Sequence, residues 1–142
     1  MSGSPTKTKG KRERIFVLND DGARRINSEL AVEIGLNESV FFLQLEFLLS
    51  VIDKLYRADP EKYKRHIQKG RLWVYSSLDS LREEYFPWWS KSTVGRIIRK
   101  LAKDKLVIVG NFNQHAYDRT QWLTINFAAA ARLWWSSFPA CS

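Results

Sequence analysis

Cysteine and histidine are scarce in this chain, which has one cysteine, Cys141, and two histidines, His66 and His115. A lone cysteine cannot form a disulfide within the chain, and this usage is typical of a reducing cytoplasm. A zinc site needs several neighbouring nitrogen or sulfur ligands, which two distant histidines and a terminal cysteine do not supply. We therefore expect no metal and no cofactor.

Catalytic signatures are also missing. The chain has no phosphate-binding loop of the GxxxxGKS or GxxxxGKT pattern, so NTP hydrolysis is not expected. A rolling-circle nickase needs paired histidines for its metal, and neither histidine here has a histidine neighbour. No Ser/His/Asp set can be nominated from spacing. We expect that the protein is not an enzyme.

Long apolar runs are absent too. The longest one, residues 40–52, is broken by Gln44, Glu46 and Ser50 and is too short to span a bilayer. The N-terminus is basic but lacks the apolar core of a signal peptide. We expect no membrane-spanning segment and a cytoplasmic protein.

The chain is rich in apolar residues and has an excess of positive charge. Its 142 residues are 44% hydrophobic, which suits one domain with a core. The net charge is +8, with +4 in residues 1–14 (five cations, one acid) and −4 in residues 28–60 (two cations, six acids). A basic surface attracts polyanions. A membrane surface would attract it as well, so charge alone does not select nucleic acid.

Residues 90–105 are the most informative stretch. Four apolar residues share one face of a helix at the spacing of a buried stripe: Val94, Ile97, Ile98 and Leu101. Ser90 is a suitable N-cap. Residues 87–105 hold six cations and one acid, Asp104, a net charge of +5. Like charges at i, i+4 repel each other, so a partner such as a phosphate backbone is expected to compensate.

The rest of the pattern predicts an α+β fold that is mainly helical. Helices are expected at 28–34, at 37–56 with Asn37 as N-cap, from Ser76 or Ser77 to Tyr85, at 90–105 and at 128–135. Strands are expected at 15–18, 72–75, 106–109 and 121–127. Gly35 is expected to close the first helix in a left-handed cap. The 37–56 helix is apolar around most of its circumference, so it is either the central core helix or shares one face with a second subunit.

The order helix, strand, helix, helix, strand, loop, strand is that of a winged helix-turn-helix with a small three-stranded antiparallel sheet. We assign residues 15–127 to this domain. Residues 1–14 are expected to form a disordered basic arm, which either adds DNA affinity or only improves solubility. Residues 128–142 form a C-terminal tail to which the sequence assigns no role.

A few residues carry smaller predictions. Residues 57–71 are expected to form a loop or a short surface helix, with His66 exposed to solvent. Trp88 and Trp89 are predicted to be core residues between two packed helices rather than stacking residues. Asp118 is predicted to stabilise the turn between the last two strands.

Several segments, in this order, resemble the N-terminal winged-helix domain of phage and plasmid replication initiators and replisome organisers. They are LAVEIGLNES (30–39), WVYSSL (73–78), FPWWSKSTV (86–94), IIRKL (97–101), GNFN (110–113) and YDRTQW (117–122). The resemblance implies DNA binding in replication initiation, often at origin repeats, in the prokaryotic cytoplasm or nucleoid. It also implies a replicative helicase or helicase loader as partner of a C-terminal region.

The chain departs from that family in two places. About 15 residues follow the wing, so we expect either that the recruiting region is missing or that this is a stand-alone DNA-binding member. The family tends to have glycine at the end of the recognition helix, where this chain has Asp104 and Lys105. We expect this helix end to close differently.

The predicted partner is double-stranded DNA, bound with the basic helix in the major groove. Arg96 and Arg99 are expected to read base edges, since arginine pairs in bidentate fashion with guanine. Ser92 and Thr93 are expected to contact a phosphate or a base. The expected phosphate contacts are Lys91, Lys100, Lys103 and Lys105. The expected wing contacts are Asn113, Gln114, His115 and Arg119.

Three alternatives remain open from sequence. The acidic long helix could carry a homodimer contact, so that a dimer reads two half-sites. The same fold could serve a transcriptional regulator, because fold does not settle function. The basic helix could instead bind an acidic protein.

Overall fold

The computed structural model describes residues 27–137, apart from the side chains of 133–137. The chain forms α1 (Ser28–Ile34), α2 (Leu36–Ala58), α3 (Pro60–Tyr63), η1 (Lys64–His66), β1 (Ile67–Gln68), β2 (Arg71–Leu72), β3 (Val74–Ser76), α4 (Leu78–Tyr85), α5 (Lys91–Lys103), β4 (Val107–Gly110), β5 (Gln121–Ile125) and α6 (Phe127–Ser137). This is an α+β fold that is mainly helical, as predicted. The predicted basic arm at 1–14 and strand at 15–18 lie outside the described residues.

The strands form two antiparallel sheets. The larger sheet has the order β3-β5-β4, with Val74 opposite Leu123 and Val107 opposite Ile125. The smaller sheet is the β1–β2 hairpin, which the sequence did not predict. The strand expected at 72–75 is split between the two sheets at Trp73, whose backbone N–H donates to His66 O at 2.8 Å. The predicted three-stranded sheet is therefore matched in part, since the strands form a two-stranded and a three-stranded sheet.

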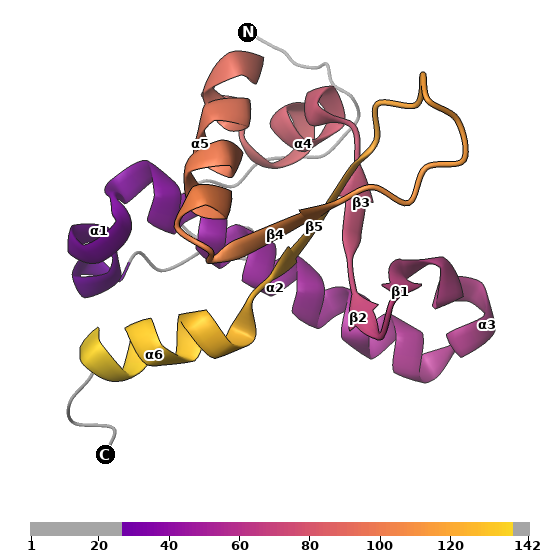
Figure 1. Ribbon diagram of the computed structural model, residues 1–142, viewed down its shortest axis with the longest axis horizontal. Helices are drawn as coiled ribbons and strands as arrows, with labels where there is room; N and C mark the ends of the chain where they lie inside the picture. Colours follow the sequence, from indigo (N-terminus) through magenta and orange to yellow (C-terminus); the bar gives the residue numbers. More distant parts are fainter. Residues whose placement is uncertain (1–26, 138–142) are drawn as a thin grey trace, which may run out of the picture.

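The long helix α2 passes behind the three-stranded sheet and α5 (Figure 1). Its buried side chains include Phe41, Phe42, Leu45 and Leu49, which belong to one core with side chains of α5 and β5. The Phe41 ring stacks on the Phe86 ring at a centroid distance of 5.0 Å. The prediction that this helix lies in the core is therefore confirmed for the face that carries these buried side chains.

The junction between α1 and α2 differs from the prediction. α2 begins at Leu36, so Asn37 is not its N-cap. Gly35 separates the two helices with φ 106° and ψ 148°, a positive φ but not the left-handed helical conformation expected. Glycine suits this position, because a Cβ here would also overlap the buried Glu38 carboxylate.

No single helix among residues 27–137 has the length and apolar content to cross a membrane. The consecutive pair α1 and α2 meets both criteria only when taken together, and it is bent by 116° at Gly35.

A row of aromatic rings connects the β1–β2 region to the larger sheet. Successive centroid distances are 4.5 Å for His66–Tyr75, 4.7 Å for Tyr75–Trp122, 5.3 Å for Trp122–Phe112 and 4.9 Å for Phe112–Trp73. The prediction that His66 is exposed is wrong, because its ring is half-buried in this row. Its Nδ1 lies 2.8 Å from Trp73 O and donates to it, since a carbonyl only accepts.

Gly110 lies against this aromatic row, which leaves no space for a side chain at that position. A Cβ at Gly110 would lie 2.8 Å from Phe112 Cε2 and 2.9 Å from Trp73 Cη2. We predict that Gly110→Ala lowers the free energy of unfolding by about 1–3 kcal/mol, the usual cost of overpacking a core, as measured by urea unfolding. The control is Val109→Ala, which truncates an exposed side chain of the same strand. Equal losses in the two variants would contradict this packing role.

Candidate nucleic-acid interface

Helix α5 forms where predicted and is anchored by its apolar face. Ser90 is the N-cap, and its Oγ accepts from the backbone N–H of Thr93 at 3.2 Å. The predicted stripe is buried in full: Val94, Ile97, Ile98 and Leu101. This burial leaves the opposite face of the helix in solvent, because a helix repeats every 3.6 residues.

The solvent face of α5 is basic, but its cations are not equivalent. Arg96, Arg99 and Lys103 are exposed, and no ion pair to them occurs within residues 27–137. Lys100 turns toward α1 instead. Its Nζ lies 3.0 Å from Asp104 Oδ2 and 3.4 Å from Ile34 O. The Lys100 charge is therefore partly neutralised inside the protein.

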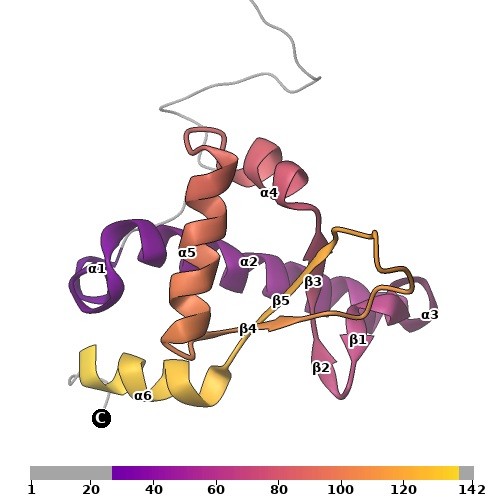
Figure 2. The same cartoon turned by 45° about the horizontal axis from the view of Figure 1, so that its top comes forward.

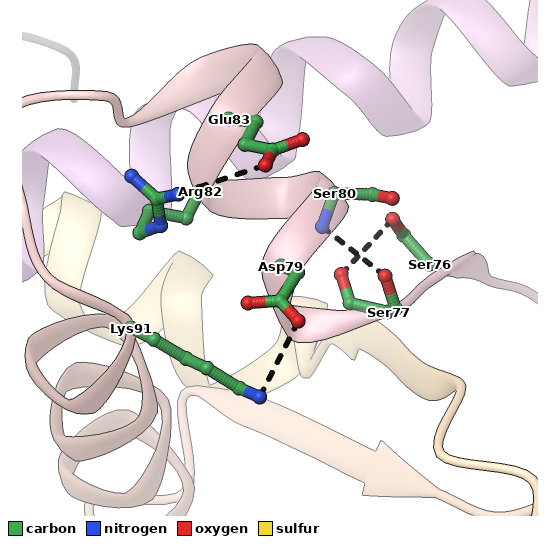
Figure 3. A network of polar contacts seen from close by, with 7 residues as sticks. All are labelled: Ser76, Ser77, Asp79, Ser80, Arg82, Glu83 and Lys91. Carbon is green, nitrogen blue, oxygen red and sulfur yellow. Dashed lines mark hydrogen bonds and ion pairs between the residues drawn. The ribbon is translucent and has the colours of Figure 1, made fainter.

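The start of α5 is tied to α4. Lys91 Nζ lies 3.4 Å from Asp79 Oδ2 across the two helices, as Figure 3 shows. On the same side, Ser77 caps α4 as predicted, with its Oγ accepting from the Ser80 N–H at 3.1 Å. Exposed ion pairs contribute little to stability. The Lys91–Asp79 pair mainly lowers the positive charge at this end of α5.

The hydroxyl groups at the start of α5 also contact the N-cap side chain. Ser90 Oγ donates to Thr93 Oγ1 at 3.0 Å and lies 3.3 Å from Ser92 Oγ. Ser92 is exposed and Thr93 is half-buried. Of the two predicted contacts, Ser92 is the more accessible.

The turn between α4 and α5 exposes an aromatic ring. Trp89 is half-buried and stacks on Phe86 at 5.2 Å, as expected of a core residue. Trp88 is 63% exposed, so its assignment to the core is wrong. Residue spacing alone could not show which of two adjacent tryptophans in a turn is exposed, because a turn has no regular periodicity.

Lys105 closes α5 in a Schellman motif. The Leu106 N–H donates to Leu101 O and the Lys105 N–H to Ala102 O, both at 3.0 Å. Lys105 has φ 63°, which is the left-handed conformation usually taken by glycine. The prediction of a different closure is wrong, since the motif is the common one with lysine in the glycine position.

This conformation gives a stability prediction. Lys105→Gly and Lys105→Ala remove the same charge, but alanine costs about 1–2 kcal/mol in the left-handed region. The larger unfolded-state entropy of glycine offsets part of that difference. We expect Lys105→Gly to be more stable than Lys105→Ala by about 1 kcal/mol in urea unfolding. An alanine variant of equal or greater stability would rule out this backbone effect.

The β4–β5 loop, residues 111–120, is ordered from within by Asn113. Its Nδ2 donates to Asp118 O and Thr120 O, both at 3.1 Å, and its Oδ1 accepts from Trp122 Nε1 at 2.7 Å. The Asn113 amide therefore holds the loop in shape. Its oxygen and its nitrogen are both engaged inside the loop, and its assignment as a DNA contact stays a prediction.

The other predicted residues of this loop lie on its surface. Gln114, His115 and Arg119 are exposed. Tyr117 is 78% exposed and was not predicted as a site residue, although its place in a polar loop was a signal that could have found it. Arg65, from η1, was also missed. Its guanidinium lies over the Tyr75 ring at 4.7 Å and the Trp122 ring at 5.7 Å.

Asp118 stabilises the loop as predicted. Its Oδ1 accepts from Thr120 Oγ1 at 2.7 Å and from the Thr120 N–H at 3.0 Å. These bonds lower the pKa of Asp118 below its ordinary value, with smaller contributions from the nearby charges of Arg65 and His115. A lowered folded-state pKa means that the stabilisation is present above the unfolded pKa and is lost as pH falls through the folded one.

Hydrogen exchange at the Thr120 amide tests this bond. We expect Asp118→Ala to lose protection at Thr120, and Asp118→Asn to keep most of it, because an amide oxygen still accepts. In the wild type, protection corrected for the intrinsic rate should fall on acidification through the Asp118 pKa. Unchanged protection in Asp118→Ala would show that other contacts hold the loop.

Figures 1 and 2 place α4 between α5 and the β4–β5 loop, with all three on the same side of the molecule. This arrangement puts the helix that carries the cations and the loop at the two ends of one side of the molecule. Within residues 27–137, no group of three or more His, Cys, Asp and Glu side chains is placed to hold a metal ion.

In comparisons with known proteins, no family model, no curated protein sequence and no solved structure matches the chain.

Proposed function

We propose that the protein binds double-stranded DNA, with α5 in the major groove. One observation carries the proposal: α5 buries one face completely and presents Arg96, Arg99 and Lys103 in solvent without an ion-pair partner among the described residues. A phosphate backbone supplies the missing negative charge. Arg96 and Arg99 read base edges, while Lys103 and Lys105 contact phosphates.

The proposal takes the fold as a winged helix-turn-helix. α4, the short turn and α5 correspond to the helix-turn-helix, and β4, β5 and the loop between them correspond to the wing. Gln114, His115 and Arg119 then contact the adjacent minor groove or backbone, and Asn113 holds the wing in shape. Lys91 and Lys100 contribute less, because each already has a carboxylate within 3.4 Å.

The biological setting is proposed from the sequence resemblance alone. We assign the protein to the initiation of phage or plasmid DNA replication, with a helicase or helicase loader as a further partner. The proposal includes a homodimer through the outer face of α2, where Leu55 is exposed and Val51 half-buried. A dimer would bring two copies of α5 to two half-sites.

Titration of labelled duplex DNA at several salt concentrations tests the proposal. We expect Arg96→Ala/Arg99→Ala to weaken binding at least tenfold, since one bidentate base contact is worth about 1–3 kcal/mol. The matched control is Lys54→Ala/Arg57→Ala, which removes the same formal charge from the last turns of α2. A stoichiometry of two chains per site would support the dimer.

The salt dependence of the affinity gives the number of phosphate contacts. For the wild type, log affinity should fall with log salt by about 0.9 for each phosphate neutralised. Equal weakening in the two double variants would assign the effect to net charge rather than to α5. Wild-type binding weaker than about 10⁻⁴ M at physiological salt would contradict DNA binding, and would redirect the search to an acidic protein partner.

A further inference from the structure

The β4–β5 loop carries a pair of aromatic rings on its outer surface. The His115 and Tyr117 rings are nearly parallel, with an interplanar angle of 10° and a centroid distance of 5.0 Å. Both residues are exposed, and Tyr117 is among the most exposed large side chains of the described chain. The pair therefore forms a preformed stack that leaves aromatic surface in contact with water.

The backbone beneath the pair is held in place. The Asp118 N–H donates to His115 O at 3.1 Å, which closes a turn around residues 115–118. Asn113 binds the carbonyl oxygens of Asp118 and Thr120 and accepts from Trp122, a fully buried side chain. A ring held this way loses less conformational freedom on binding than a ring on a mobile loop.

The electrostatic surroundings of the pair favour a polyanion. Arg119 follows in the same loop and is exposed, and Arg65 lies over the base of the loop on Tyr75 and Trp122. The Asp118 carboxylate, which is the acid of this loop, accepts from Thr120. Two exposed rings beside exposed cations match the chemistry of a nucleobase attached to a phosphate backbone.

We propose that His115 and Tyr117 form a stacking platform for an unpaired DNA base, at the wing end of the surface that binds the duplex. Inside a duplex both faces of each base are covered by its neighbours, so the platform can take a base only where pairing is broken. Stacking on aromatic rings tolerates any base, since every base has a π-face. The platform therefore distinguishes open from paired DNA and adds no sequence preference. This inference rests on the proposed function, because it places the platform beside α5 on DNA.

The test compares two labelled probes, a fully paired duplex and the same duplex with an internal bubble of mismatched thymines. The wild type should bind the bubble duplex about tenfold more tightly, the effect of one base stacking on an aromatic side chain. Tyr117→Phe keeps the ring and should keep this preference. Tyr117→Leu keeps an apolar side chain of similar size without the ring, and should reduce the ratio of the two affinities to near one.

A fluorescent purine analogue inside the bubble, facing a purine with which it does not pair, provides a direct readout. Its emission should be quenched on binding of the wild type and of Tyr117→Phe, and much less on binding of Tyr117→Leu. Circular dichroism of each variant checks that the fold is kept. His115→Leu should weaken the quenching in the same direction, because it removes the ring that supports Tyr117.

The outcomes separate this inference from the proposed function. Tight duplex binding that depends on Arg96 and Arg99, with the same bubble preference in wild type and Tyr117→Leu, would overturn the platform and leave duplex recognition standing. Quenching that depends on Tyr117 without measurable binding to the paired duplex would support the platform and overturn duplex recognition. If the protein binds neither probe, both the platform and duplex recognition are overturned.

Discussion

The burial of one face of α5 is the constraint on which the rest of the candidate site depends. Each fully buried Val, Leu or Ile contributes about 1.5–3 kcal/mol, and four of them share this face: Val94, Ile97, Ile98 and Leu101. Repulsion between like charges on the other face amounts to only a few tenths of a kcal/mol per pair. The core term is therefore larger, and the helix folds although Arg96, Arg99 and Lys103 have no ion pair among the described residues. That unpaired charge is available to a partner.

The second constraint is the aromatic row that runs from η1 to the β4–β5 loop. Trp122 occupies its centre, contacting the Tyr75 and Phe112 rings and donating to Asn113 Oδ1. Its ring is fully buried, although it lies at the foot of a surface loop. A loop anchored at such a side chain keeps one shape, which is what a surface that recognises a ligand needs. η1 contributes His66 to this row, and the His66 ring packs against the Tyr75 ring at 4.5 Å.

The two ends of the surface offer different chemistry. α5 presents guanidinium and ammonium groups on a rigid helix, which suits phosphates and the edges of bases. The β4–β5 loop presents ring faces beside Arg119, which suits the face of a base. α4 lies between them and is linked to α5 through the Lys91–Asp79 pair (Figure 3). Both elements lie on one side of the molecule, as the proposed contact with a single nucleic acid requires.

The sequence by itself determined the elements whose causes are local. The α5 stripe and the caps at Ser90 and Ser77 depend on residues within a few positions of one another. The stripe and the Ser90 cap were predicted correctly, and Ser77 is one of the two residues predicted to cap α4. The bonds from Asp118 to Thr120 are equally local. Helical periodicity and capping act over a turn or two of chain, so no knowledge of the fold is needed to predict them.

Only the tertiary structure decided what the individual side chains do. Lys100 Nζ lies 3.4 Å from a carbonyl 66 positions away in the sequence, at Ile34, in addition to its pairing with the Asp104 carboxylate four residues on. Asn113 is committed to the loop because Trp122 lies beneath it, and His66 is covered because Trp73 and Tyr75 fold over it. These outcomes depend on contacts across a loop or between separate elements, which helical periodicity and capping patterns do not describe. Composition and residue spacing carry no information on which of these groups meet in space. They could therefore predict the helix and its charged residues, but not the partner of each side chain.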